Sequence, residues 1–190
     1  MARFAVALVH GPVLDRHGHE QTTALTNLDV HDVARSARTF GCAAFYVVTP
    51  VAAQQQQARA VVGFWDGADG RRRNKDRAEA LSLANVVGTL DDAVAAETSV
   101  IGRPPLLVAT SAKEQGAVRY EELRRRLDDD DDGGALILFG TGAGMTQAML
   151  DRCDAVLAPI VGPPDREGRC WNHLSVRSAA AIVLDRLRGA

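Results

Sequence analysis

Two short apolar runs in the C-terminal part of the chain each stop at a loop that carries glycine. Ala135–Phe139 ends at Gly140–Gly144, and Ala155–Ile160 ends just before Gly162. A polar stretch, Asn172–Ser178, then leads directly into an Ala-rich amphipathic segment. Strands that are buried on both faces of a parallel sheet read as apolar runs, and α/β proteins bind ligands at the carboxyl ends of such strands. This part of the chain therefore predicts a ligand crevice.

The glycine loop alone does not identify a ligand. Gly140, Gly142 and Gly144 are spaced more tightly than in a dinucleotide fingerprint, and the chain has no acidic residue where a ribose-binding carboxylate is expected. It also lacks the Lys-Ser/Thr pair of a phosphate-binding P-loop. Taken by itself the loop fits an ordinary strand-to-helix turn. Two such loops followed by Asn172–Ser178 favour a binding site.

Further apolar runs predict the rest of a sheet. They alternate with helical periodicity, which is typical of an α/β fold with a mostly parallel sheet of about five or six strands flanked by helices. We expect one domain over residues 1–190. His10 follows the first run; it suits a turn, and it should lie at the crevice end of the sheet. The other runs are Phe4–Val9, Ala43–Val48, Val86–Val87 and Pro105–Ala109.

A helix is predicted between Thr26 and Gly41. Thr26 or Asn27 can cap its start, Asp29 suits its positive first turn, and Gly41 supplies a C-terminal stop. Arg35 and Arg38 lie about one turn apart, away from much of the apolar stripe. Considered alone, they are typical of a solvated basic face.

Charge restricts how the chain can meet nucleic acid. The formal net charge of −2 excludes a strongly basic nucleic-acid binder, so any RNA contact must be local. The densest positive stretch, Gly67–Arg77, is predicted to be a loop that is either solvated or in contact with RNA phosphates. Asp128–Asp132 is predicted to be a solvated connection without a metal. The three cysteines are widely spaced and no apolar run spans a membrane, so we expect a cytoplasmic protein without disulfides, zinc or a membrane segment.

Three stretches, in this order, resemble the motifs of the SPOUT superfamily of S-adenosylmethionine-dependent RNA methyltransferases, in its SpoU-like branch. They are residues 26–41, residues 138–145, and residues 158–162 together with 173–182. The chain is most similar to a small bacterial family of RNA methyltransferases of this fold, over nearly its whole length. The resemblance implies a C-terminal trefoil knot, which connectivity rules alone would make very improbable. It also implies a homodimer in which the cofactor pocket lies beside the subunit interface. The helix that begins near Ser175 is expected to form that interface.

The resemblance also implies roles for individual residues. Arg35 matches the functional arginine of the first motif and would engage the RNA acceptor, and Asp29 stands at a catalytic position earlier on the same helix. The resemblance leaves Arg38 ambiguous between an RNA contact and a solvated face. Independently of the resemblance, their positive charge makes Arg71, Arg72, Arg73 and Lys75 candidate RNA contacts. S-adenosylmethionine would be bound by Thr110, Ser111, Phe139, Gly140, Thr141, Gly142, Ile160, Gly162, Asn172, His173, Leu174, Ser175 and Ser178.

Three departures from the SpoU-like pattern leave the reaction open. Asp29 replaces the usual Asn, a Glu is missing from Phe139–Gly142, and His173-Leu174-Ser175 replaces Ser-Leu-Asn. The helpers of ribose 2'-O transfer are thus altered, and base methylation is equally open. Two other classes remain: a catalytically idle RNA-binding module of the same fold, and a nucleotide-binding α/β enzyme that uses the glycines for phosphate.

Overall fold

Six parallel strands form the central sheet. The computed structural model describes residues 3–113, 117–130 and 133–189. Every pair of neighbouring strands in this sheet is parallel, in the order β5-β4-β1-β7-β6-β8. The predicted α/β fold with a mostly parallel sheet is therefore confirmed. The strands are β1 (Arg3–Val9), β4 (Ala44–Val48), β5 (Ala84–Val87), β6 (Leu106–Thr110), β7 (Gly134–Gly140) and β8 (Ala155–Leu157), beside a small antiparallel pair, β2 (Val13–Leu14) and β3 (Glu20–Gln21).

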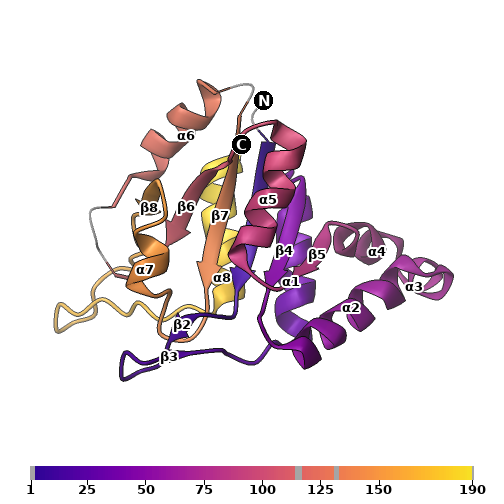
Figure 1. Ribbon diagram of the computed structural model, residues 1–190. Helices are drawn as coiled ribbons and strands as arrows, with labels where there is room; N and C mark the ends of the chain where they lie inside the picture. Colours follow the sequence, from indigo (N-terminus) through magenta and orange to yellow (C-terminus); the bar gives the residue numbers. More distant parts are fainter. Residues whose placement is uncertain (1–2, 114–116, 131–132, 190) are drawn as a thin grey trace.

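Helices cover both faces of this sheet (Figure 1). On β1, Phe4 and its alternate neighbours pack with α1, α6 and α8, whereas Ala5, Ala7 and Val9 pack with α5 and α7. Strand β1 is thus buried on both faces, as its apolar run predicts. The helices are α1 (Asn27–Thr39), α2 (Ala52–Asp66), α3 (Ala68–Arg73), α4 (Lys75–Leu81), α5 (Leu90–Ile101), α6 (Tyr120–Asp128), α7 (Gln147–Leu150) and α8 (Val176–Arg188).

The order of the strands brings distant segments together at the centre of the sheet. Strand β7 lies between β1 and β6, although more than 120 residues separate it from β1 in the sequence. Val9, the last residue of β1, pairs with Gly140, the last residue of β7. The segments that follow these two strands therefore start side by side. In open α/β sheets this kind of reversal of strand order marks the ligand crevice. The trefoil knot stays a prediction.

Helix α1 begins as its sequence predicts. The Thr26 hydroxyl accepts a hydrogen bond from the backbone N–H of Asp29, and the Asp29 carboxylate accepts one from the N–H of Thr26. This reciprocal pair is a capping box, which satisfies two of the unpaired N–H groups at a helix start. Gly41 follows the helix with a φ of +69°, in the left-handed region that favours glycine.

The predicted loop over Gly67–Arg77 is wrong, because α3 and α4 occupy this stretch. Gly70 does not break the helix: a Cβ there would lie 2.4 Å from the Phe64 carbonyl oxygen, so glycine allows α3 to pack closely on the end of α2. Asn74 separates the two short helices and caps α4 by accepting from the N–H of Arg77. The glycines and charges therefore reflect helix packing and capping.

Smaller differences concern where elements end. The predicted strand Ala155–Ile160 stops at Leu157, and α8 starts at Val176, where the Ser175 hydroxyl caps it. Of the aspartate run, Asp130 pairs with Arg103, and residues 131–132 lie outside the described residues. Among the described residues, no helix is both long and apolar enough to cross a membrane, and no cluster of three potential metal ligands occurs.

Candidate functional site

The predicted cofactor segments meet at the carboxyl edge of the sheet. Ala109 pairs with Leu138 across β6 and β7, and Thr110 pairs with Leu157 across β6 and β8. The Thr110 hydroxyl donates to the Leu138 carbonyl oxygen over 2.8 Å and thereby ties the end of β6 to β7. Three strands thus end together, and the loops that follow them carry Ser111, Gly140–Gly142 and Ile160–Gly162.

The segment between β8 and α8 folds back onto this edge. The Asn172 side-chain amide donates to the Ala112 carbonyl oxygen over 2.7 Å, which fixes the segment to the loop after β6. A Cβ on Gly162 would lie 3.8 Å from the Trp171 carbonyl oxygen, so the start and the end of the segment are close. His173 packs edge-to-face on Trp171, with ring centroids 6.1 Å apart.

The glycine loop after β7 is held by its own backbone. The N–H groups of Thr141, Ala143 and Gly144 donate to the carbonyl oxygens of Val9, Leu14 and Thr141, over 3.2, 2.8 and 3.1 Å. A phosphate-binding loop needs its N–H groups directed at the anion. These three N–H groups are already bonded within the protein, which weighs against a phosphate cradle and against the nucleotide-binding alternative.

Gly142 shows why this loop requires glycine. Its φ of +63° lies in the left-handed region, and a Cβ there would stand 2.6 Å from the Leu14 carbonyl oxygen. Gly140 meets a flexible neighbour, since a Cβ would lie 2.7 Å from Cγ of Met145. Phe139 is 1% exposed, so only its backbone can contact a ligand. The glycines therefore serve the fit of the loop against β2 and Met145.

His10 is a candidate that the sequence placed at this edge without assigning it a role. It is 1% exposed, and its Nδ1 lies 3.1 Å from the Thr23 hydroxyl. That hydroxyl lies 2.5 Å from the Thr141 hydroxyl in the glycine loop. Burial lowers the pKa of His10 below its usual value, against the opposing effect of the Asp29 charge. A histidine that directly follows a buried strand was the available signal.

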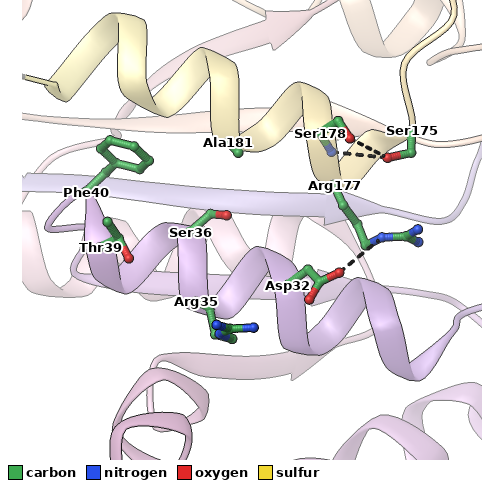
Figure 2. Close-up of a pocket in the computed structure, with 9 residues that line it drawn as sticks. All are labelled: Asp32, Arg35, Ser36, Thr39, Phe40, Ser175, Arg177, Ser178 and Ala181. Carbon is green, nitrogen blue, oxygen red and sulfur yellow. Dashed lines mark hydrogen bonds and ion pairs between the residues drawn. The ribbon is translucent and has the colours of Figure 1, made fainter.

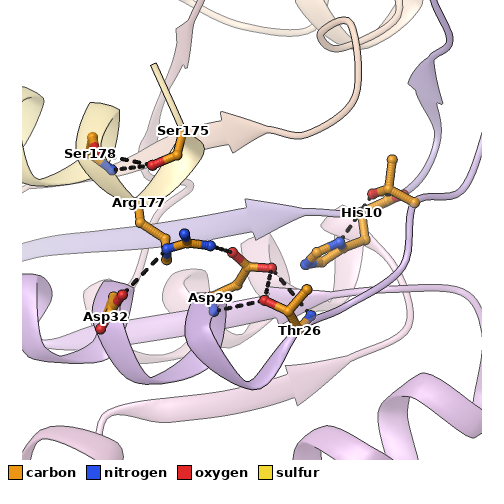
Figure 3. A network of polar contacts seen from close by, with 8 residues as sticks. His10, Thr26, Asp29, Asp32, Ser175, Arg177 and Ser178 are labelled. Carbon is orange, nitrogen blue, oxygen red and sulfur yellow. Dashed lines mark hydrogen bonds and ion pairs between the residues drawn. The ribbon is translucent and has the colours of Figure 1, made fainter. Parts of the chain in front are cut away.

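An ion-pair cluster joins the starts of α1 and α8 (Figure 3). Nη1 of Arg177 donates to Oδ1 of Asp29 over 2.9 Å, and its Nε lies 3.3 Å from Oδ2 of Asp32. The second oxygen of Asp29 accepts from the backbone N–H and the hydroxyl of Thr26, over 3.2 and 2.7 Å. Both oxygens of Asp29 are thus engaged, an arrangement suited to a clamp between helices. Arg177 was not predicted, although it lies within the third motif.

A groove of about 560 Å³ runs between α1 and α8 beside this cluster (Figure 2). Arg35 lines the groove, is exposed, and has no ion-pair partner among the described residues. Ser175 and Ser178, predicted to bind cofactor, line the same groove, whereas Thr110 and Thr141 do not. The full lining consists of Asp32, Arg35, Ser36, Thr39, Phe40, Ser175, Arg177, Ser178 and Ala181.

The remaining predicted RNA contacts lie elsewhere. Figure 1 shows α3 beyond β5, on the side of the sheet away from β8. There, Arg71 pairs with Asp66 and Arg72 pairs with Asp69, and Arg38 on α1 pairs with Glu79 on α4. Arg73 and Lys75 are exposed on the same stretch. Exposed ion pairs contribute about 0–1 kcal/mol, so a phosphate can replace these carboxylates at little cost.

Solved structures share this fold. A probable methyltransferase from Bordetella pertussis Tohama I superposes with a TM-score of 0.63 at 20% identity, covering 98% of this chain and 93% of that one. The SpoU methyltransferase AviRb from Streptomyces viridochromogenes, in complex with AdoMet, superposes with a TM-score of 0.54 at 20% identity, covering 96% and 56%. At these identities the likeness shows the fold.

Sequence comparison identifies the family. A tRNA (guanine-N(1)-)-methyltransferase of Oleidesulfovibrio alaskensis is 38% identical over 183 residues, which are 96% of this chain and 41% of the relative. The chain thus spans about two fifths of that relative's length. An uncharacterized protein of Aquifex aeolicus is also 38% identical over 183 residues, covering 96% of this chain and 86% of the relative. The family described as SAM-dependent RNA methyltransferase matches residues 3–189. With a match of that extent, the chain belongs to the family of SAM-dependent RNA methyltransferases.

Proposed function

We propose that this protein transfers the methyl group of S-adenosylmethionine to a tRNA in the cytoplasm. The observation that carries the proposal is the meeting of the loops after β6, β7 and β8 at one edge of the sheet, with Asn172 fixing the segment before α8 to the same edge. The choice of tRNA rests on the relative from O. alaskensis. The base or ribose that is methylated is left open, because that relative is more than twice as long as the matched region.

The residues at this edge suit an uncharged adenosyl group. The hydroxyls of Thr110 and Thr141 lie close to backbone carbonyl oxygens, at 2.8 and 3.0 Å, and the loop itself carries no side-chain charge. We place the adenosine between Gly140–Gly142 and Ile160–Gly162, with Asn172–Leu174 closing the site. When bound, the cofactor supplies an electrophilic methyl group. The protein has to hold the acceptor in line with it and exclude competing geometries.

Arg35 is assigned to the RNA. An arginine does not accept protons, because its pKa lies above ~12. Its planar guanidinium binds phosphate through two parallel hydrogen bonds and stabilises a deprotonated acceptor. Arg35 is exposed in the groove and has no carboxylate partner among the described residues, so it is available for this role.

We also propose a homodimer and the family's knot. Three large apolar side chains, Val161, Trp171 and Leu174, are 55%, 81% and 43% exposed on the segment that closes the cofactor site. The groove between α1 and α8 lies nearby, because Ser175, which follows Leu174 and caps α8, lines it. A second protomer that covers this face would bury the apolar side chains and complete the crevice. Sedimentation at micromolar concentration should show twice the monomer mass.

Calorimetry with S-adenosylmethionine, S-adenosylhomocysteine, ATP and NAD tests the function. We expect binding of the first two ligands and transfer of labelled methyl groups to a tRNA fraction. Gly140→Val should displace Met145 and weaken cofactor binding, whereas Gly63→Val, with open space around it on α2, is the matched control. Binding of ATP or NAD alone would point to a nucleotide enzyme. RNA binding without any cofactor binding would point to an idle module.

A further inference from the structure

A partly buried series of side-chain hydrogen bonds leads from the end of β1 into the glycine loop. His10 Nδ1 meets the Thr23 hydroxyl at 3.1 Å, and that hydroxyl meets the Thr141 hydroxyl at 2.5 Å. The Thr141 hydroxyl in turn lies 3.0 Å from the Val9 carbonyl oxygen, and the Thr23 hydroxyl lies 3.3 Å from the His10 carbonyl oxygen. Through Thr141, this series of hydrogen bonds extends from His10 to the proposed cofactor site.

The number of protons available to these hydrogen bonds indicates which ring nitrogen of His10 carries a proton. Each threonine hydroxyl has one proton to donate. If Nδ1 carries the imidazole proton, three of the four contacts can form together, with either Thr23 or Thr141 donating across the contact between the hydroxyls. If Nδ1 is an acceptor, Thr23 must donate to it, and the single proton of Thr141 can serve either Thr23 or the Val9 carbonyl oxygen, so only two contacts form. The network therefore favours a proton on Nδ1, and burial, which lowers the pKa of His10, favours the neutral ring.

The other ring nitrogen, Nε2, is left as a bare acceptor. It is buried, and within the described part of the chain it has no hydrogen-bond partner. Figure 3 shows the imidazole directed toward Asp29, whose carboxylate is also an acceptor and is engaged by Thr26 and Arg177. Within the described residues, Nδ1 is therefore the ring nitrogen through which His10 contacts the protein.

We propose that His10 is a positioning residue for the methyl donor. Its Nδ1–H, acting through Thr23, holds Thr141 and with it the glycine loop in the form that binds S-adenosylmethionine. The inference rests on the proposed location of the cofactor at this loop. It assigns to the end of β1 a part in cofactor binding, although His10 itself does not reach the cofactor.

A pair of substitutions separates the two ring nitrogens. In His10→Asn the side-chain amide can take the place of Nδ1 and donate to Thr23, whereas in His10→Gln the amide lies near the place of Nε2. We expect the Kd for S-adenosylmethionine to stay within about threefold of the original value in His10→Asn. It should rise about tenfold, equivalent to one lost hydrogen bond of ~1.4 kcal/mol, in His10→Gln. Thr23→Val removes the middle hydroxyl and should match His10→Gln.

His31→Gln is the matched control. His31 also has a buried ring nitrogen for which the described residues offer no hydrogen-bond partner, but it lies on α1 against Trp65, with ring centroids 5.7 Å apart. We expect cofactor affinity in this variant to equal that of the original protein. A role of His10 in stability alone would lower the melting temperature but leave the melting-temperature increase caused by S-adenosylhomocysteine unchanged, so both values should be measured for every variant.

Nitrogen-15 NMR of the imidazoles gives a second readout. The His10 signals should show a proton on Nδ1 and should shift when S-adenosylhomocysteine is added, while those of His31 stay in place. Equal cofactor affinity in His10→Gln, Thr23→Val and the original protein would overturn the inference and leave the proposed function intact. If the original protein itself shows no binding heat with S-adenosylmethionine, the proposed function fails, and the inference fails with it.

Discussion

Two buried polar clusters lie at opposite ends of β1, and they are built differently. At the amino end, Glu97 from α5 is fully buried, and its carboxylate accepts from Nε and Nη2 of Arg3 over 2.6 and 3.1 Å and from the Tyr46 hydroxyl over 2.7 Å. At the carboxyl end, Nε2 of His10 has no hydrogen-bond partner among the residues that the structure describes. One cluster is complete, and the other is incomplete.

We infer from this difference that the amino end of β1 serves stability and the carboxyl end serves function. A buried polar network in which every group is paired makes the interior rigid, whereas groups left incompletely paired in a native structure are expected at functional sites. The Glu97 hydrogen bond raises the pKa of Arg3, and burial followed by the same hydrogen bond raises the pKa of Tyr46. The complete cluster lies at the amino ends of the strands, away from the proposed cofactor edge.

The largest effect should come from breaking the complete cluster. Glu97→Ala leaves the Tyr46 hydroxyl and the Arg3 guanidinium without their acceptor and should lower the unfolding free energy by about 3–5 kcal/mol. Cofactor affinity of the folded fraction should not change. Chemical denaturation measures the loss. Glu79→Ala, which removes only an exposed partner of Arg38, is the control and should cost less than about 1 kcal/mol. Similar losses in both variants would contradict the contrast between the two ends.

Replacing Arg35 in the groove should lower activity and leave stability unchanged. Arg35→Ala should leave the unfolding free energy and cofactor affinity nearly unchanged, within about twofold for the Kd, and lower methyl transfer ~100-fold, the scale of a lost charge stabiliser. Arg35→Lys should restore little, because an ammonium group lacks the planar fork. Single-turnover methylation of a tRNA fraction provides the measurement. If Arg35→Ala methylates at the original rate, Arg35 belongs to a solvated helix face.

A substitution of Asp29 distinguishes a structural role of its carboxylate from a catalytic one. As a clamp it holds Arg177 and caps α1; as a catalytic group it would act on the acceptor. Asp29→Asn keeps the size and can still accept from Thr26, but it loses the charge that faces Arg177, so we expect roughly 1–2 kcal/mol lower stability and less than threefold change in methyl transfer. Asp32→Asn, with a more exposed carboxylate, should cost less. A large drop in methyl transfer at unchanged stability would favour the catalytic role.

Local patterns predicted much of this molecule. The apolar runs of β1, β4, β6 and β7, the Thr26 cap of α1 and the glycine stop at Gly41 follow from rules that act over a few residues. The false loop at Gly67–Arg77 arose because glycine is also used where two helices approach closely, and the sequence does not show which neighbour Gly70 meets.

The parts of the site that were missed depend on long-range contacts. Arg177 lies 148 residues from its partner Asp29, and Thr141 lies 118 residues from Thr23. These contacts exist because β7 enters the sheet beside β1, an order that no local pattern encodes. The motifs therefore indicated segments that meet at the carboxyl edge of the sheet. They did not show that the hydroxyl of Thr141 contacts that of Thr23, or that Asp29 is paired with Arg177.

The smallest effect concerns pH at the incomplete cluster. Burial lowers the pKa of folded His10 below the value of about 6.5 expected in the unfolded chain, and Asp29, the charged group that it faces, opposes this only in part. The unfolded state then binds the additional proton first, so the contribution of His10 to stability is present above pH ~6.5 and is lost as the pH falls below it. The slope for one such group is at most about 1.4 kcal/mol per pH unit.

The pKa of His31 is also lowered, so the pH dependence of stability in the original protein alone does not isolate the contribution of His10. Denaturation of the original protein and of His10→Asn at several values between pH 7 and pH 5 gives the difference. We expect the original protein to lose stability more steeply, and parallel curves would show that His10 does not remain neutral in the folded state.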